Sequence, residues 1–279
     1  MLDLSSGKAR LGFGLTFATI ASFLGFPVLW MLSTAFKPGA EIFVRFPSLL
    51  PRAPTLENFR GVVGSGDLPL WLGNSLLTAG GAALLTTVLA TLAAHSFARF
   101  RYRGRRALMA LMISAQMFPF AVLLVSLYPM LQAAGLLDTR IGLTLSYIVF
   151  ALPAGTYMLF SYFVRLPEEL IEAARVDGAS ELRILWRIIV PVSIPGLVTV
   201  ALYAFMWAWN DLLYAMTLIT TPSLRTVGPG LLMSQLGEMR QDWGAAMAAS
   251  LVASLPVIIA FGLVQRWFVQ GLTAGAVKG

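Results

Sequence analysis

The sequence LPEELIEAARVDGASELRILWRIIVP, from Leu166 to Pro191, is a charged segment between two long apolar ones. It holds five of the chain's 13 acidic residues and three of its 20 basic residues, although the 279-residue protein is 58% hydrophobic. Charge concentrated in this way is expensive to place inside a bilayer, so the segment is expected at a membrane surface. It predicts an ordered polar loop on one face of a membrane protein.

Helix signals divide this segment into two short helices joined by a turn. Pro167 suits the first position of a helix, and Glu168 and Glu169 suit its first turn, where carboxylates face the helix dipole. Gly178 can take the left-handed conformation that ends a helix, and Ser180 can cap the next one. In that second helix four apolar residues share one face at i, i+3, i+4 and i+7: Leu182, Leu185, Trp186 and Ile189. Such a unit can lie along the membrane surface and present its turn as a protruding contact point, here called the knob.

Two interpretations of this knob follow from its residues. Ala173 and Ala174 would let another surface approach closely, and Gly178 would fix the position of the turn. Glu172 could pair with an arginine or lysine at the rim of a partner. An interfacial amphipathic hairpin without a partner explains the same residues equally well. The physical pattern leaves both open.

Composition places most of the chain inside a membrane. The mean hydropathy is +0.78 and 12% of the residues are charged, which is too little polar surface for a soluble protein of this length. The sequence has no cysteine, which excludes disulfides, thiolate catalysis and cysteine-ligated metals. The pI of about 10.1 reflects basic residues that flank apolar segments, so it indicates membrane orientation rather than nucleic-acid binding.

Six apolar segments are long enough to cross a bilayer, so the expected fold class is an all-α integral membrane protein with six transmembrane helices. The expected spans are residues 11–32, 72–94, 107–131, 141–163, 192–219 and 244–265, in a single domain of residues 1–279. The first span is longer than the apolar region of a signal peptide and is expected to stay in the mature chain. The sequence contains no phosphate-binding glycine-rich loop, so ATP and Mg²⁺ would have to bind to another polypeptide.

The basic residues orient these spans. Thirteen of the 20 lysines and arginines lie on the side that holds both termini, and five of them crowd the short loop Arg99–Arg106. Short loops rich in arginine stay in the cytoplasm. Both termini and the segment 166–191 are therefore expected on the cytoplasmic side of the membrane, with the loops 35–70 and 220–243 outside.

The segment 166–191 also carries a motif. The pattern Glu172-Ala173-Ala174, three residues, Gly178, nine residues and then Ile188-Ile189-Val190-Pro191 resembles the EAA motif of the permease subunits of binding-protein-dependent ABC importers. Val190 stands where the family usually has leucine. The resemblance extends over nearly the whole chain, through Glu57-Asn58-Phe59, Asn74-Ser75, the run Ala98–Arg105, Trp209-Asn210-Asp211 and the tail Gly271–Gly279.

The resemblance implies roles for particular residues. In such permeases the motif forms coupling helices that dock in a cleft of the ATPase subunit, and this role is carried to Glu172, Ala173, Ala174, Asp177 and Gly178. The tail is similar to the end of the six-span permease subunit of the maltose-type importer. That similarity implies contact with the ATPase for the last five residues: Gly275, Ala276, Val277, Lys278 and Gly279. By its residues alone this tail would be a frayed terminus.

The resemblance further implies a complete importer. Its partners would be a second homologous permease subunit, two ATPase subunits and an extracytoplasmic substrate-binding protein, within membrane lipid and without nucleic acid. The chain itself would bind no cofactor and would not be an enzyme, because the ATPases hold ATP and Mg²⁺. Its function would be to translocate a carbohydrate, such as a disaccharide or oligosaccharide, by alternating access. The sequence does not specify the sugar.

The fifth expected span contains an acidic residue, and a carboxylate inside a membrane is a candidate functional group. The candidate substrate pathway combines this carboxylate with an amide and aromatic rings, which suit a sugar: Trp209, Asn210, Asp211 and Tyr214. An interhelical hydrogen bond beside an interfacial aromatic belt explains the same residues, and the sequence favours it. His95, the single histidine, is expected to be a hydrogen-bonded packing residue.

The expected outer loop 220–243 also has two interpretations. By resemblance it enters the cleft of the binding protein, with Gln241 and Trp243 as candidate contacts. An ordinary solvated loop accounts equally well for its polar residues.

Other classes fit less well. An ion-coupled secondary transporter typically places several ionisable residues near the middle of the membrane, and Asp211 and His95 are the two available. A membrane-embedded enzyme would need clustered acids, histidines or metal ligands, and the one acidic cluster lies in the segment 166–191. No metal site is predicted. An importer permease for a non-sugar solute is a further alternative.

Overall fold

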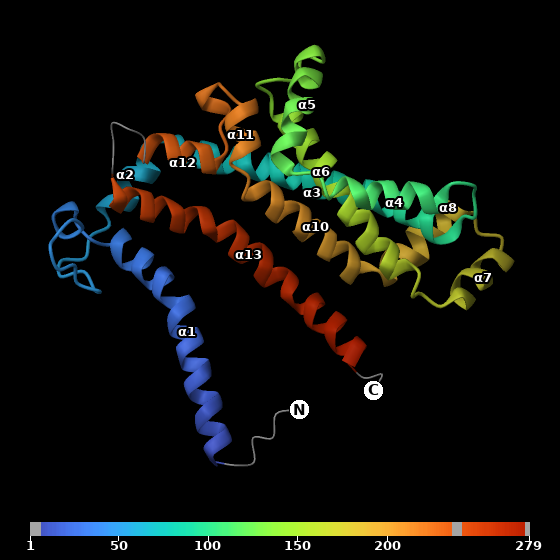
Figure 1. Cartoon of the computed structure of the whole chain (residues 1–279), viewed down its shortest axis with the longest axis horizontal. Coiled ribbons are helices and arrows are strands. Elements are labelled where there is room, and N and C mark those ends of the chain that lie inside the picture. The colour runs from blue at the N-terminus through green and yellow to red at the C-terminus, as the bar shows by residue number, and fades with distance from the viewer. Residues whose placement is uncertain (1–6, 236–241, 277–279) are drawn as a thin grey trace. The chain divides into compact units, whose positions relative to one another are not determined.

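The computed structural model describes residues 7–235 and 242–276, and within them every regular element is a helix. The chain divides into two compact units. The first comprises Met1–Leu68 and Leu231–Ser254, and the second comprises Pro69–Gly230 and Leu255–Gly279. Helices α12(Val227–Gln235) and α13(Trp243–Ala276) each contribute to both units (Figure 1).

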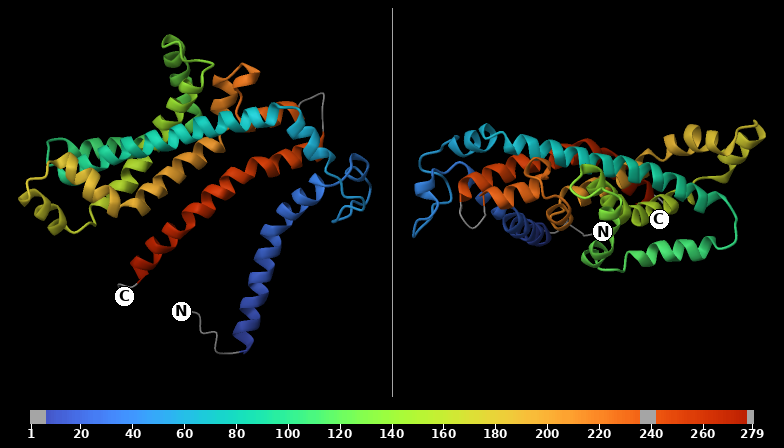
Figure 2. Two further views of the ribbon diagram at one scale, coloured as in Figure 1. Left: turned by 180° about the vertical axis from the view of Figure 1, so that it is seen from behind. Right: turned by 90° about the horizontal axis from the view of Figure 1, so that it is seen from above.

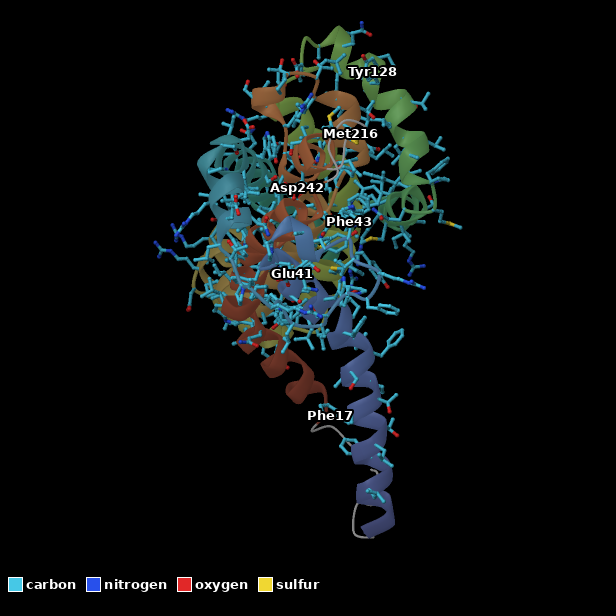
Figure 3. All side chains as sticks on the ribbon, turned by 90° about the vertical axis from the view of Figure 1, so that its left-hand side faces the viewer. Phe17, Glu41, Phe43, Tyr128, Met216 and Asp242 are labelled. Carbon is cyan, nitrogen blue, oxygen red and sulfur yellow. The ribbon has the colours of Figure 1, made fainter. Side chains whose placement is uncertain are left out.

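The first unit begins with α1(Gly7–Ala35), an apolar helix whose side chains are exposed along most of its length. The most apolar 18-residue stretch of this helix has no buried residue, and Figure 3 shows Phe17 standing out from the helix. A helix that is apolar on all sides is suited to lipid or to the helices of another chain. Two short helices, η1(Gly39–Glu41) and α2(Glu57–Gly64), follow within the connection from α1 to α3(Asp67–Arg99).

A buried lysine organises the chain after α1. Lys37 is 1% exposed; its Nζ donates a hydrogen bond to the carbonyl oxygen of Ser48 at 2.6 Å and lies 4.7 Å from the ring centroid of Trp30. Asn58 of α2 donates to the carbonyl oxygens of Ala35 and Lys37. Because burying an ammonium group is costly unless it is hydrogen-bonded, these contacts hold the connection in one defined conformation.

The second unit is built on three helices packed against one another: α3, α6(Arg140–Phe163) and α10(Ile194–Trp209) (Figures 1 and 2). Small residues meet where they cross, and Ala83, Ala151 and Ala204 are buried together. Gly155 of α6 continues this contact, since a Cβ atom added there would lie 2.9 Å from Cγ1 of Val200. Small residues let membrane helices approach closely and gain van der Waals contact.

Shorter helices surround these three. They are α4(Arg105–Ala115), α5(Phe120–Ala133), α7(Glu168–Val176), α8(Glu181–Ile184), η2(Leu185–Ile189), α9(Val190–Val192), α11(Leu213–Leu218) and η3(Pro222–Leu224). Helix α4 packs along α6, and α5 and α11 project together from one side of the packed helices (Figures 1 and 2). Helix α7 stands at the end where α8 and the last turns of α3 lie.

Four helices among the described residues are long and apolar enough to cross a membrane as single rods. They lie at Leu11–Ala35, Asp67–Arg99, Arg140–Phe163 and Trp243–Gln265. The chain bends by 102° between α4 and α5, and by 83° between the stretch Glu181–Val192 and α10, so six spans are reached if each bent pair is one span. The expectation of an all-helical, multi-span protein is met.

The expectation of an unbroken helix across residues 107–131 and across residues 192–219 is not met. Helix α4 ends at Ala115 and α5 starts after Pro119, whose ring cannot continue the helical hydrogen-bond ladder. Helix α10 ends at Trp209, and α11 starts at Leu213. Each interruption is too short to lower the mean hydropathy of its span, which is why composition alone did not locate them.

Replacing Gly155 with valine should destabilise the protein by about 1–3 kcal/mol, because the new side chain overpacks the contact between α6 and α10. The measurement is thermal unfolding of the detergent-purified protein. Gly80→Ala is the matched control, because a Cβ atom there meets no atom of the chain within 4 Å. Equal unfolding temperatures for Gly155→Val and the wild type would show that this contact is loose.

Candidate functional site

The segment 166–191 forms a helical hairpin at one end of the second unit. Ile171 and Ala174, on one face of α7, are buried in a cluster with Ala94 of α3, Phe163 of α6 and Leu185 of η2. Aliphatic burial of this kind fixes α7 against the helices beneath it. The opposite face of α7 is left at the surface.

Gly178 ends α7 with a Schellman motif. Its φ is +77°; its N–H donates to the carbonyl oxygen of Arg175 at 3.0 Å, and the N–H of Ala179 donates to that of Ala174 at 3.0 Å. Ala179 also packs against the cluster that buries Ala174, as this motif commonly requires. The left-handed conformation costs a residue with a side chain about 1–2 kcal/mol. The turn therefore lies at the residue where the sequence predicted it.

The residues assigned to docking divide between two faces. Four of the five are exposed: Glu172, Ala173, Asp177 and Gly178. Ala174 is 7% exposed and packs inward, so close approach by a partner is open at Ala173 and not at Ala174. Val176, which is 88% exposed, lies three residues after Ala173 and shares its face. Helical spacing in the sequence already places Val176 on the face of Ala173. The EAA motif does not include Val176, so this residue was not assigned to docking from the sequence.

The second helix of the hairpin differs from its expected form. Leu185 and Ile189 are buried as expected, whereas Leu182 and Trp186 are 60% and 44% exposed. The buried face is formed instead by Ile184, Leu185 and Ile189, and the last two belong to η2, a wider π-helical turn. Ser180 occupies the expected capping position, but its hydroxyl makes no capping hydrogen bond.

An ion pair closes the hairpin. Nε of Arg175 donates to Oε1 of Glu181 at 2.8 Å, and this bond raises the pKa of Arg175 above its usual value. The other carboxylate oxygen of Glu181 lies 3.9 Å from Nε2 of His95 on α3. His95 is buried, but neither ring nitrogen has a hydrogen-bond partner, so the expectation of a hydrogen-bonded packing residue is not met.

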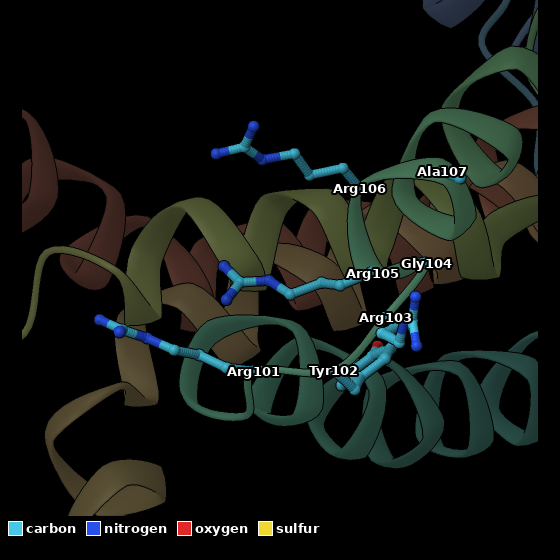
Figure 4. A pocket seen from close by; sticks show the side chains of 7 residues that line it. All are labelled: Arg101, Tyr102, Arg103, Gly104, Arg105, Arg106 and Ala107. Carbon is cyan, nitrogen blue, oxygen red and sulfur yellow. The ribbon is translucent and has the colours of Figure 1, made fainter.

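A basic cavity lies where α3 passes into α4 (Figure 4). It measures about 820 Å³ and is lined by Arg101, Tyr102, Arg103, Gly104, Arg105, Arg106 and Ala107. Arg105 also stands 5.9 Å from the ring centroid of Phe160. Within residues 7–235 and 242–276 no acidic side chain pairs with these arginines. Guanidinium groups left without a carboxylate suit the phosphate groups of lipids.

Asp211 lies in the interruption between α10 and α11 and is 8% exposed. Its Oδ2 accepts hydrogen bonds from the hydroxyl of Tyr147 and from the N–H of Ala215, both at 2.9 Å. Its Oδ1 accepts from the N–H of Tyr214 at 3.3 Å. The carboxylate therefore satisfies the free backbone donors at the start of α11 and ties them to α6. This geometry matches the structural interpretation that the sequence favoured.

Tyr214 connects this interruption to the one between α4 and α5. Its hydroxyl donates to the carbonyl oxygen of Phe120 at 2.9 Å, and the two rings stack with centroids 4.0 Å apart. Gln116, in the other interruption, donates from Nε2 to the carbonyl oxygen of Phe150 at 2.9 Å. These hydrogen bonds therefore tie both interruptions to neighbouring helices.

A second cavity, of about 650 Å³, opens where the interruptions meet. It is lined by Phe120, Tyr203, Met206, Trp207, Asn210, Asp211, Leu212 and Leu213. The Trp207 ring lies with its centroid 3.7 Å from that of Phe150 and 4.4 Å from that of Phe120. The walls are thus aromatic and aliphatic, with the exposed amide of Asn210 as a polar group. This combination can hold a ligand that has both hydroxyl groups and an apolar face.

The four predicted pathway residues are not equivalent in this geometry. Asn210 and Asp211 line the cavity, whereas Trp209 and Tyr214 are 8% and 1% exposed and belong to the packing around it. Trp207 was not assigned to the pathway, although its place three residues before Asn210 on one helix was an available signal. In the described part of the chain, no group of three or more His, Asp or Glu could hold a metal ion.

Residues 86–274 match the protein family described as binding-protein-dependent transport system inner membrane component. The chain belongs to this family. The inner membrane ABC transporter permease protein YcjP of Escherichia coli K12 is 36% identical over 273 residues, which cover 97% of each chain. The trehalose transport system permease protein SugB of Mycobacterium tuberculosis is 38% identical over 259 residues, which cover 91% of this chain and 92% of that protein.

A solved structure supports the fold of this permease subunit. In the crystal structure of a bacterial ABC transporter involved in the import of the acidic polysaccharide alginate, one chain superposes with a TM-score of 0.81 at 21% identity. The superposition covers 94% of this chain and 98% of that one.

The chain after α11 is strapped to other parts of the second unit. The carboxylate of Asp138 accepts hydrogen bonds from the hydroxyl and N–H of Thr221 and from the N–H of Thr220. These bonds hold the pKa of Asp138 below its usual value, and the bond from the Thr221 hydroxyl has the largest effect. Asn74 of α3 donates from Nδ2 to the carbonyl oxygen of Ser223 at 2.9 Å. These hydrogen bonds therefore fix the start of the expected outer loop, which is not a loosely solvated segment.

Other predicted contacts of the permease fall at the edge of the described residues. Helix α13 continues to Ala276, past the expected end of the span at residue 265, so the backbone of Gly275 and Ala276 is helical. Residues 277–279, with Val277, Lys278 and Gly279, lie outside the described residues, and so does Gln241. Trp243 is the first residue of α13 and is 38% exposed. Contact of these residues with partners stays a prediction.

Replacing Asp211 with asparagine should destabilise the permease by about 1–3 kcal/mol, because the amide turns a donor toward groups that are themselves donors. Thermal unfolding of the purified protein measures the effect. Tyr147→Phe is the matched comparison, since it removes one of the three donors and leaves the two backbone N–H groups paired; its effect should be smaller. An Asp211→Asn variant that unfolds like the wild type but loses substrate-dependent activity would contradict the structural role.

Proposed function

We propose that this permease subunit forms half of the membrane pathway of an ATP-driven, binding-protein-dependent importer that carries a carbohydrate into the cytoplasm. The observation that carries the proposal is the hairpin 166–191, in a chain of the inner-membrane-component family. Its apolar side packs on α3 and α6, and its turn is fixed by the left-handed conformation of Gly178. A rigid knob of this kind passes the movement of a soluble partner to the helices beneath it.

The exposed face of the hairpin suits a cleft on an ATPase subunit. Ala173 and Val176 form its apolar centre, while Glu172 and Asp177 stand at its edge. An interface with an apolar centre and a charged rim is typical of specific docking between proteins. We assign these residues to the contact, with Ala174 and Gly178 shaping the turn from within.

The importer has further parts. A second homologous permease completes the pathway, two ATPase subunits bind ATP and Mg²⁺, and an extracytoplasmic binding protein delivers the substrate. The hairpin, the arginine-lined cavity and both termini face the cytoplasm, following the distribution of basic residues. ATP-driven closure of the ATPases moves the hairpins and switches the pathway from inward-facing to outward-facing. The tail Gly275–Gly279 contacts the ATPase, and Gln241 and Trp243 contact the binding protein.

A carbohydrate is the substrate class that the second cavity supports best. The relative SugB is a permease protein of a trehalose transport system, and the structural neighbour belongs to a transporter involved in alginate import. In the cavity the rings of Trp207 and Tyr203 offer aromatic faces, and Asn210 offers an amide that can bond hydroxyl groups. Interrupted membrane helices beside a cavity mark binding sites in many transporters. Asp211 holds the shape of this site, and Asn210 makes the polar contact.

The proposal is tested by isolating the tagged permease from its native membrane in mild detergent and identifying the proteins that accompany it. We expect an ATPase, a second permease and a binding protein. The reconstituted complex should accumulate labelled trehalose, maltose or diacetylchitobiose in proteoliposomes only with Mg-ATP and the loaded binding protein. A chain that purifies alone, or as a homodimer without an ATPase, would contradict the proposal.

Replacing Gly178 with valine should uncouple ATP hydrolysis from uptake while the complex still assembles. A β-branched residue is strained by about 1–2 kcal/mol at a positive φ, so the Schellman turn opens. Gly178→Asn is the matched control, because asparagine adopts this conformation more readily than other residues with side chains. The measurement is ATP hydrolysed per sugar taken up. Normal coupling in Gly178→Val would show that the geometry of the turn is not required.

A further inference from the structure

His95 provides the polar contact between α3 and the hairpin. Nε2 of His95 lies 3.9 Å from Oε2 of Glu181. Within residues 7–235 and 242–276, no other hydrogen bond or ion pair joins α3 to the segment 166–191. The remaining contact between them is apolar, through residues such as Ala90 and Ala94 of α3.

The imidazole of His95 and Oε2 of Glu181 are buried and have unused hydrogen-bonding capacity toward each other. His95 is 6% exposed, and neither its ring nitrogens nor Oε2 of Glu181 has a hydrogen-bond partner. Arg99, one turn further along α3, donates instead to the carbonyl oxygen of Phe163 at 2.8 Å. The ring of Phe100 meets the imidazole edge-on at 5.7 Å. An unpaired buried polar group costs about 1–3 kcal/mol, so a small approach of the pair, by about 1 Å, is favoured.

Glu181 is held on its other side by the hairpin itself. Its Oε1 accepts from Nε of Arg175 at 2.8 Å, across the turn at Gly178. The carboxylate therefore moves with both arms of the hairpin. Apolar surfaces can slide past each other, whereas a hydrogen bond has a preferred direction and distance. The carboxylate is thus placed to transmit a directed displacement of the hairpin to α3.

Helix α3 reaches from this contact to the opposite end of the second unit. It is one unbroken helix of 33 residues, which makes it about 50 Å long. Near its start Asn74 donates to the carbonyl oxygens of Ser223 and Arg225, and the Ser75 hydroxyl accepts from the N–H of Val227. The same rod therefore contacts the hairpin at one end and the chain after α11 at the other.

We infer that His95 is a positioning residue for coupling: its imidazole N–H closes onto the Glu181 carboxylate when the hairpin moves, and this bond makes α3 follow the hairpin. The inference rests on the proposed function. It assigns to the single histidine a role in linking the docking surface to the chain that follows α11. His95 contacts neither nucleotide nor substrate.

The test compares His95→Ala with His95→Gln in the complete importer, reconstituted in proteoliposomes with the disaccharide that the wild type accumulates best among labelled trehalose, maltose and diacetylchitobiose. Losing the bond should raise the ATP hydrolysed per sugar taken up by about tenfold in His95→Ala. Glutamine keeps an N–H donor, so His95→Gln should restore the ratio to within about twofold of the wild type. His95→Leu is similar in size but has no donor, so it should be impaired like His95→Ala, whereas a role in packing alone would leave it close to His95→Gln.

Two further variants keep the test decisive if His95→Ala assembles poorly. Glu181→Ala removes the same bond from a partly exposed residue, with a side chain 36% exposed, and should raise the ratio by a similar factor. Thr86→Val is the control on α3, because it removes a different buried polar group without a partner, a hydroxyl, and keeps the side-chain shape. The double variant His95→Ala, Glu181→Ala should be no worse than Glu181→Ala alone, because His95 acts through its bond to that carboxylate.

Particular outcomes would overturn the inference. It fails if His95→Ala and Glu181→Ala couple like the wild type, if His95→Gln is as impaired as His95→Ala, or if the two single effects add. Such results would leave the proposed function intact, since the wild type would still show uptake driven by ATP. A wild-type complex without ATP-dependent uptake would overturn the proposed function, and this inference with it.

Discussion

Two interruptions of helix, at residues 116–119 and 210–212, set the strongest physical constraint on this protein. Backbone groups freed by a broken helix inside a membrane must find partners within the protein, because lipid offers none. Asp211 accepts the N–H groups that open α11, and tight turns pair the N–H groups of residues 116–118 with the last carbonyl oxygens of α4. The side chains of Tyr214 and Gln116 add hydrogen bonds to the carbonyl oxygens of Phe120 and Phe150. These bonds tie α5, α6 and α11 together. The second cavity opens where the two interruptions meet.

The close packing of α3, α6 and α10 gives these interruptions a firm support. Ala83, Ala151 and Ala204 bring the three helices together without bulky side chains, and Gly155 allows Val200 to approach. Close contact suits rods that must move as units, because well-packed helices shift together and do not deform continuously. The hairpin and the cavity therefore belong to one mechanical body, the second unit, and the unbroken α3 runs along it.

The sequence carried the local features of the site and missed those that depend on contacts between distant residues. Gly178 was predictable because the end of a helix requires a positive φ that glycine adopts without cost. The π-helix at Leu185–Ile189 was not predictable from the apolar pattern, since a count of apolar positions assumes a regular turn. Pro119 marked a possible interruption, but membrane helices often accommodate proline, so it did not distinguish a kink from a break. The approach of His95 to Glu181 joins residues far apart in the chain, and no local pattern indicates it.

The hydrogen bonds of Asp211 indicate whether an ion gradient or a soluble partner drives transport. A carboxylate that couples transport to an ion gradient must be able to exchange its partners as the protein changes state. Asp211 accepts hydrogen bonds from a tyrosine hydroxyl and from two backbone N–H groups that hold the start of α11. Releasing it would uncover those donors at a cost of about 1–3 kcal/mol each. A carboxylate committed to structure in this way is poorly suited to ion coupling. The driving force is better supplied from the surface, where the exposed hairpin offers a soluble partner a rigid point of contact with the helices of the second unit.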